Sequence, residues 1–142
     1  MEITFTTELE KLKEFLGNGL DNFNKPYNNN IVPFEDKKPF GFQVFDGDAL
    51  VGGACGTTGM GNWAWVELLY VDEKYRDKDI GTKLIEKVEA FAREHKCTGV
   101  HLKTWDWQAK GFYEKVGFTC YGILENNPPG GSCHYMKKEL TK

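Results

Sequence analysis

The segment from Leu69 to Ile85 constrains the fold of this chain more than any other stretch. It begins with the apolar run of a β-strand, continues through a short charged loop, and at Gly81 enters a segment with helical spacing, in which the apolar positions are Leu84, Ile85, Val88, Phe91 and Ala92. The first amides of a helix have no partner within the helix and lie at the positive end of its dipole. A strand, a tight loop and a helix start therefore predict a site for an anion such as a phosphate group.

Composition limits the class of protein. The chain has 142 residues, of which 40% are hydrophobic and 14% aromatic, which suits one compact domain over residues 1–142. No apolar run reaches the ~18 residues of a membrane span, and a net charge of −3 without a basic stripe argues against a nucleic-acid partner. The start of the chain lacks the pattern of a secretory signal, and the four cysteines form no CxxC pair. We therefore expect a cytoplasmic protein with reduced thiols, no metal site and no membrane partner.

The order of elements predicts an α+β fold with a mixed central sheet of about six or seven strands flanked by helices. We expect a short strand over residues 3–5, a helix capped by Thr7 that ends near Gly17 or Gly19, and a loop over residues 18–39. Three antiparallel strands follow, over residues 40–45, 49–57 and 63–71. The remaining elements are a helix over 82–96, a strand over 99–105, a helix over 108–115 and strands over 118–124 and 133–140.

Two motifs resemble the GCN5-related N-acetyltransferase (GNAT) superfamily. The first is a strand ending in Leu69-Tyr70-Val71 followed by the loop Arg76-Asp77-Lys78-Asp79-Ile80-Gly81. The second is the run from Asp106 to Phe118, which contains Tyr113-Glu114-Lys115-Val116-Gly117-Phe118. The Pro128-Pro129-Gly130 tail, followed by a closing strand, is similar to that of a bacterial subgroup of small-molecule acetyltransferases.

This resemblance implies the GNAT fold, acetyl-coenzyme A as the acetyl donor, and direct attack of a small-molecule primary amine on the thioester in a ternary complex. It also implies that two strands splay apart beside the pantetheine arm, to which Val71 offers its backbone groups. The residues that it places at the cofactor are Leu69, Tyr70, Val71, Arg76, Asp77, Lys78, Asp79, Ile80, Gly81, Thr82, Asp106, Ala109, Phe112 and Tyr113.

Two positions depart from the family pattern. Asp79 stands where the family has its middle glycine, and Asp106 stands where it has asparagine. A carboxylate near the pyrophosphate repels it, so we expect Asp79 to weaken cofactor binding. Alternatively, Asp79 caps the helix by accepting a hydrogen bond from one of its free amides.

Two residues are candidates for proton transfer. Strand alternation predicts that Trp65, Glu67, Leu69 and Val71 share one face, on which Glu67 is the only carboxylate. We expect Glu67 to be partly buried and to act as the general base, directly or through water; the alternative is an exposed strand residue or an ion pair. The resemblance implies that Tyr113 protonates the departing thiolate; the alternative is a structural tyrosine.

Other functions remain open at this point. The chain could acetylate a protein lysine or amino terminus, bind acyl-coenzyme A without turnover, or be an unrelated phosphate-binding domain. We expect residues 18–39 and 125–134 to shape the acceptor pocket, with His134 as a conceivable substrate contact. An exposed edge of the last strand makes a homodimer reasonable.

Overall fold

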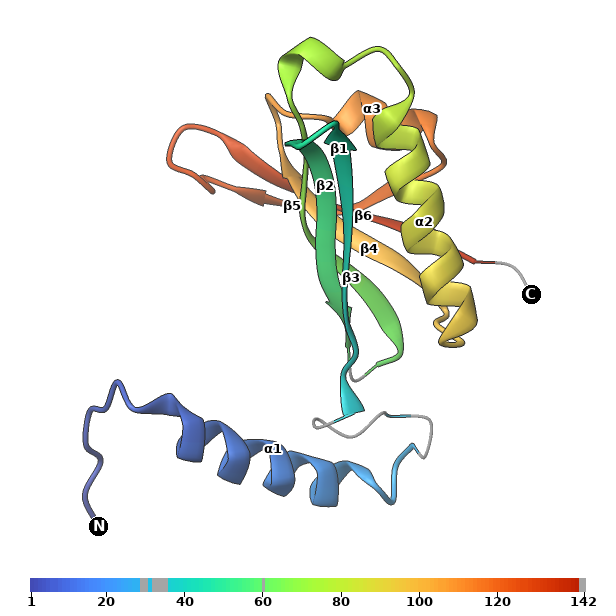
Figure 1. Ribbon diagram of the computed structural model, residues 1–142. Coiled ribbons are helices and arrows are strands. Elements are labelled where there is room, and N and C mark those ends of the chain that lie inside the picture. The colour runs from blue at the N-terminus through green and yellow to red at the C-terminus, as the bar shows by residue number, and fades with distance from the viewer. Residues whose placement is uncertain (29–30, 32–35, 60, 141–142) are drawn as a thin grey trace.

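The computed structural model describes residues 1–28, 31, 36–59 and 61–140. Its centre is a mixed six-stranded sheet in the order β1-β2-β3-β4-β6-β5, with α2 and α3 beside it (Figure 1). The strands are β1 (Pro39–Asp46), β2 (Ala49–Thr58), β3 (Trp63–Val71), β4 (Gly99–Trp105), β5 (Thr119–Glu125) and β6 (Ser132–Glu139). The helices are α1 (Leu9–Asn24), α2 (Ile80–Glu94) and α3 (Lys110–Lys115), with a 3-10 turn, η2 (Glu73–Tyr75). The expected α+β class with a mixed central sheet is confirmed.

Strands β1, β2 and β3 form an antiparallel meander, as expected. Asp46 pairs with Ala49 across the β1–β2 turn, in which Gly47 has a φ of +59°. Glycine adopts this left-handed conformation without steric cost, which is why so short a turn can reverse the chain here.

Helix α2 packs on one face of the sheet through a single apolar stripe. The buried residues of this helix are Leu84, Ile85, Val88 and Ala92. Their spacing places them on the side of the helix that meets the sheet. The helix ends before Lys96, whose φ is +59°, and the Cys97 amide donates to the Ala92 carbonyl at 2.7 Å. Compared with the expected range of 82–96, the helix starts two residues earlier, at Ile80, and ends two residues earlier, at Glu94.

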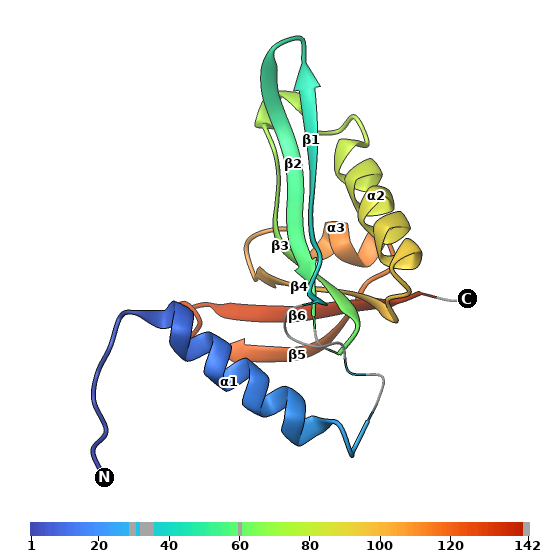
Figure 2. The same cartoon turned by 60° about the horizontal axis from the view of Figure 1, so that its bottom comes forward.

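Strands β4, β6 and β5 form the second half of the sheet. In Figure 2 they run across the direction of β1 and β2, because the sheet is strongly twisted. Strand β6 lies between β4 and β5. The expectation that the last strand offers an exposed edge is therefore wrong, since both of its edges are paired.

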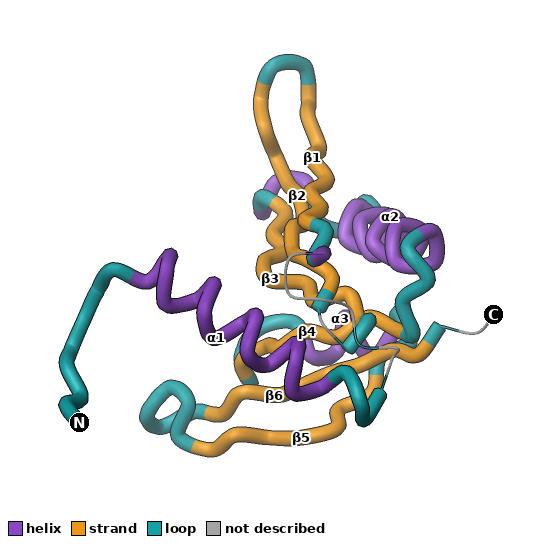
Figure 3. The backbone as a smooth tube through the Cα atoms, turned by 90° about the horizontal axis from the view of Figure 1, so that it is seen from below, coloured by secondary structure: helices purple, strands orange, loops and turns teal. Residues whose placement is uncertain are grey.

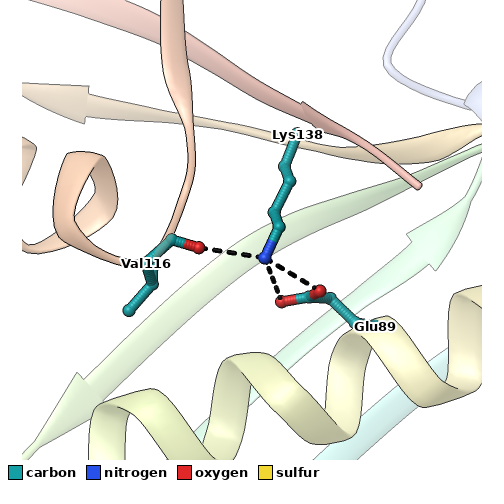
Figure 4. A network of polar contacts seen from close by, with 3 residues as sticks. All are labelled: Glu89, Val116 and Lys138. Carbon is teal, nitrogen blue, oxygen red and sulfur yellow. Dashed lines mark hydrogen bonds and ion pairs between the residues drawn. The ribbon is translucent and has the colours of Figure 1, made fainter. Parts of the chain in front are cut away.

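A polar network ties β6 to both helices (Figure 4). The Lys138 Nζ donates to the Val116 carbonyl at 3.0 Å, at the end of α3, and lies 3.1 Å from Glu89 Oε1 on α2. Both charged side chains are largely shielded from solvent. This network fixes α3 against α2, which is the arrangement that the site below depends on.

The N-terminal segment differs from the expectations in three ways. Residues 3–5 form no strand, and Glu8 rather than Thr7 occupies the N-cap position of α1. The helix continues past Gly17 to Asn24, because each glycine costs only ~1 kcal/mol and the apolar stripe continues through Leu20 and Phe23. The expected loop over 18–39 is thus wrong for residues 18–24. Residues 29–30 and 32–35 of that loop lie outside the described residues.

Helix α1 lies apart from the sheet in Figure 1. Its apolar side chains are all exposed: Leu9, Leu12, Phe15, Leu16, Leu20 and Phe23. In the view of Figure 3, α2 lies on one side of β1–β3, and among the described helices none is packed on the other side. No helix in the described part of the chain is long and apolar enough to cross a membrane.

Candidate functional site

The loop between β3 and α2 is held in place in its first half. At its start, the Tyr75 amide donates to the Asp72 carbonyl at 2.8 Å, which closes the turn η2. The Tyr75 hydroxyl donates to Asp46 Oδ2 in the β1–β2 hairpin at 2.5 Å, and this hydrogen bond raises the pKa of Tyr75. The loop is therefore anchored to the sheet rather than free in solvent.

Two aspartates in this loop adopt left-handed backbone conformations. Asp77 has a φ of +63° and Asp79 a φ of +60°. Aspartate tolerates this region better than most residues, and glycine tolerates it best. The left-handed backbone directly before α2 explains the family's glycine at position 79 more directly than close approach of a ligand does. This backbone conformation is not visible in the sequence pattern.

The start of α2 is an uncompensated positive helix end. Asp79 is the N-cap residue, but its side chain makes no capping hydrogen bond within the described structure, so the alternative of a capping role is wrong. The first turn, which includes Ile80, Gly81 and Thr82, carries no acidic residue. The first amides of this helix are thus free of intrahelical partners, which is the arrangement that binds anions.

Two basic side chains of the loop before this helix are held by neighbouring residues. The Arg76 Nε donates to the Val71 carbonyl at 2.9 Å, and the Arg76 guanidinium lies 5.6 Å from the centre of the Tyr70 ring. Lys78 Nζ lies 5.8 Å from the centre of the Tyr75 ring. Arg76 is therefore held at the end of β3, and the Val71 carbonyl that we expected to serve the pantetheine arm is already engaged by it.

Strands β3 and β4 separate next to this loop. Their parallel pairing covers only Trp63–Trp65 against Gly99–His101, whereas β3 runs on to Val71 and β4 to Trp105. Beyond the paired stretch, the edge of β3 that faces β4 has no ladder partner there. Unpaired backbone groups at a strand edge are available to a ligand with amide groups of its own. The expected splay of the two strands is present.

A β-bulge displaces Glu67. Cys55 of β2 pairs with Leu68, but its neighbour Gly56 pairs with Val66, so Glu67 is an extra residue in β3. A bulge of this kind re-aims the side chains that follow it.

The bulge overturns the expected alternation. Ala64 before the bulge is buried in the core, and both Leu69 and Val71 after it pack against that core. A continuous alternation would have placed Trp65, Glu67, Leu69 and Val71 together, which is wrong because the extra residue reverses the pattern. Glu67 is exposed rather than partly buried as expected.

The second motif reaches the first through α3. A Cβ atom on Gly81 would lie 3.0 Å from Phe112 Cζ and 3.2 Å from Phe112 Cε1. The start of α2 can approach α3 this closely only because residue 81 has no side chain. Ile80, Ala109 and Phe112 are all partly buried against the same core.

Tyr113 follows Phe112 and is only 6% exposed. Its ring makes edge contacts with Phe112 and Phe118 at centroid distances of 5.2 and 5.7 Å. Burial raises the pKa of Tyr113 to about 12, because the phenolate would be poorly solvated. Tyr113 is therefore fully protonated at neutral pH, as a proton donor must be.

The turn before α3 is fastened by two residues that sequence reasoning missed. Gln108 Oε1 accepts from the Trp105 amide at 2.8 Å, and Thr104 Oγ1 donates to the same oxygen at 3.2 Å. The Ala109 amide lies 3.4 Å from Thr104 Oγ1. A Thr-x-x-x-Gln spacing at the end of a strand is the signal that could have identified them.

Asp106 and the expected acceptor loop meet on the other side of this turn. The Asp106 amide donates to the Ser132 carbonyl at 3.0 Å, and Trp107 packs against Gly131. His134 is buried, with its Nε2 3.0 Å from Ser132 Oγ. Residues 126–131 thus form an ordered turn, closed by hydrogen bonds from the Asn126 amide to the Gly131 carbonyl and from the Gly131 amide to the Pro128 carbonyl, and His134 follows it in β6 with its ring engaged by Ser132.

Comparisons with known proteins agree with this geometry. The blasticidin-S acetyltransferase of Streptomyces morookaense is 42% identical over 90 residues, which cover 61% of this chain and 66% of that protein, so the match spans just under two-thirds of that relative. A crystal structure of an acetyltransferase from Bacillus cereus is 27% identical, covers 99% of this chain and 98% of its own, and has a TM-score of 0.81. A structure from Bacillus anthracis in complex with acetyl coenzyme A shares the fold, with a TM-score of 0.67 at 24% identity over 72% of this chain and 63% of its own.

The family relationship rests on most of the sequence. The model of the acetyltransferase (GNAT) family matches residues 7–118, which include the strand, the loop and the second motif described above. The resemblance found in the two motifs is thereby confirmed. This chain belongs to the acetyltransferase (GNAT) family.

Proposed function

We propose that residues 1–142 form a single N-acetyltransferase domain that transfers the acetyl group of acetyl-coenzyme A to a primary amine of a small molecule. The observation that carries this proposal is the contact between Gly81 and Phe112. This contact joins the start of α2 to α3, the helix that carries the buried, protonated Tyr113, and α2 follows the strand whose edge is unpaired beyond Trp65.

The residues present fit such a donor. The first amides of α2, with Arg76, Lys78 and Lys83 nearby in the sequence, would hold the pyrophosphate. The unpaired edge of β3 would hold the amide groups of the pantetheine arm. Asp79 is an unfavourable charge directly before this helix start, since its carboxylate repels phosphate. A B. anthracis protein of the same fold was crystallised with acetyl coenzyme A, which supports this donor.

In the proposed reaction, a carbon–nitrogen bond to the amine forms and the carbon–sulfur bond of the thioester breaks. Glu67, directly or through water, accepts the proton that the ammonium group loses. Tyr113 donates its phenolic proton to the departing thiolate and recovers one from solvent. The high pKa of Tyr113 keeps that proton in place until the thiolate forms.

A small-molecule acceptor is the class we favour, because the blasticidin-S acetyltransferase is the relative with 42% identity. The proposal is tested by titrating acetyl-coenzyme A calorimetrically and then measuring free thiol release with a panel of amines that includes blasticidin S. Binding followed by amine-dependent release supports it. Binding without release for any amine would instead favour an acyl-coenzyme A-binding module, and release only with peptides would favour a protein acetyltransferase.

A further inference from the structure

Helix α1 carries an apolar stripe that no described residue of its own chain covers. The stripe consists of Leu9, Leu12, Leu16, Leu20 and Phe23, flanked by Phe15, which is 75% exposed. The spacing of these residues places them along one side of the helix. A continuous exposed apolar surface of this kind marks an interaction site in a folded protein.

The same chain carries a second uncovered apolar surface, here called the outer groove. It lies on the face of β1–β3 opposite α2, where Leu68 is 66% and Tyr70 63% exposed. The groove has a volume of about 390 Å³, and its lining includes Leu50, Gly53, Cys55, Leu68 and Tyr70. Helix α1 is roughly 24 Å long and the ten-residue strand β2 roughly 33 Å, so the helix fits along the strand.

The N-terminal helix is part of what this chain shares with another protein. The match to the Bacillus cereus crystal structure covers 99% of this chain with a TM-score of 0.81, so the alignment extends over the residues of α1.

The C-terminal end of α1 is ordered. The amides of Tyr27 and Asn28 donate to the Asn24 carbonyl, and the rings of Phe23 and Tyr27 are in contact with centroids 5.6 Å apart. Helix α1 thus ends in a defined turn at residues 24–28.

We propose that the occupant of the outer groove is helix α1 of a second copy of this chain, so that two copies exchange their N-terminal helices in a two-fold dimer. Each chain has one apolar helix stripe and one apolar groove, which is what a reciprocal exchange requires. In the dimer, α1 of each copy covers the outer groove of the other, so both apolar surfaces are removed from water. The inference does not depend on which acceptor the enzyme uses.

The first test is the mass of the full chain in solution by light scattering after gel filtration. The expected result is twice the chain mass of 16.2 kDa. Leu16→Glu, in the apolar stripe, should give monomers, whereas Asn18→Glu adds the same charge on the opposite side of α1 and should leave the dimer intact. A monomeric wild-type protein, or a dimer unaffected by Leu16→Glu, would overturn the proposal.

The second test distinguishes exchange from other uses of α1. Leu16→Cys, treated with a short bismaleimide, should cross-link to the Cys55 in the groove of the other copy and give a covalent dimer on a denaturing gel. Adding Cys55→Ala should abolish that dimer. A cross-link only within one chain would mean that α1 folds back on its own groove, and a covalent dimer that survives Cys55→Ala would mean that the two α1 helices meet each other. Either result contradicts the proposal.

Discussion

Gly81 and Phe112 are in van der Waals contact at the point where the two family motifs meet, with only 3.0 Å between Phe112 Cζ and the place of a Cβ on residue 81. Helix α2 presents its first amides to the anion site, and α3 presents Tyr113. This contact sets the distance between the two halves of the proposed site. The requirement for glycine here comes from packing between helices as well as from access to a ligand.

A methyl group at this contact should therefore weaken donor binding. Gly81→Ala must displace the Phe112 ring by a few tenths of an ångström, and Gly81→Val by more, at a cost of about 1–3 kcal/mol. We expect the Kd for acetyl-coenzyme A, measured by calorimetry, to rise in that order. Gly111→Ala is the matched control, because Gly111 is also the second residue of its helix but has open space around its Cβ position. Equal effects of Gly81→Ala and Gly111→Ala would refute the packing argument.

Replacing Asp79 should tighten donor binding. A carboxylate ~6 Å from a phosphate charge costs about 2–3 kcal/mol at an effective dielectric constant of ~20, and less when water screens it. Asp79→Asn removes the charge and still tolerates the left-handed conformation, whereas Asp79→Gly also removes the backbone strain. Both should lower the Kd for acetyl-coenzyme A, and Asp79→Gly should also raise the Tm. If both variants bind more weakly, Asp79 makes a contact that the donor needs.

Lys138→Met should destabilise the protein, because it leaves the shielded Glu89 carboxylate without its partner. The expected loss in the free energy of unfolding is about 1–3 kcal/mol, measured by urea denaturation. Lys137→Met is the control, since Lys137 pairs with Glu139 at an exposed site where ion pairs contribute about 0–1 kcal/mol. Equal losses for the two variants would show that the network of Figure 4 does not fix the helices.

Glu67→Gln should reduce the rate most near neutral pH and recover at higher pH. A base is needed only while the acceptor amine still carries its proton, and that fraction falls as the pH rises. The measurement is kcat against pH for the wild type and the variant with one amine. A deficit that is the same at every pH would assign Glu67 to substrate positioning instead.

The order of strands and helices in residues 39–139 could be predicted because apolar periodicity and turn residues are local. The reversal of alternation at Glu67 could not, since a bulge depends on the register between β2 and β3. The left-handed backbone conformation at Asp79 could not be predicted either, because an aspartate side chain does not indicate its own φ angle. The length of α1 differs from the prediction because its apolar stripe continues past Gly17 and Gly19, which local helix propensity alone would place at the end of the helix.

For the site residues, too, local patterns could be predicted and tertiary contacts could not. The two motifs named Gly81 and Tyr113 directly, but their relation through Phe112 is a tertiary contact between elements some thirty residues apart. Thr104 and Gln108 were missed because their hydrogen bonds belong to a turn and not to a repeating pattern.

The comparison of Tyr113→Phe with the wild type tests the central claim most directly. Because the pKa of Tyr113 is raised to about 12, the phenol stays protonated at every pH below that value, so its contribution should not vary between pH 7 and 10. We expect kcat for amine-dependent thiol release to fall by roughly ten- to a thousandfold across that range, the loss typical of one general acid. The Kd for acetyl-coenzyme A should not change. Full activity of folded Tyr113→Phe with several amines would contradict the account and leave the tyrosine a structural role alone.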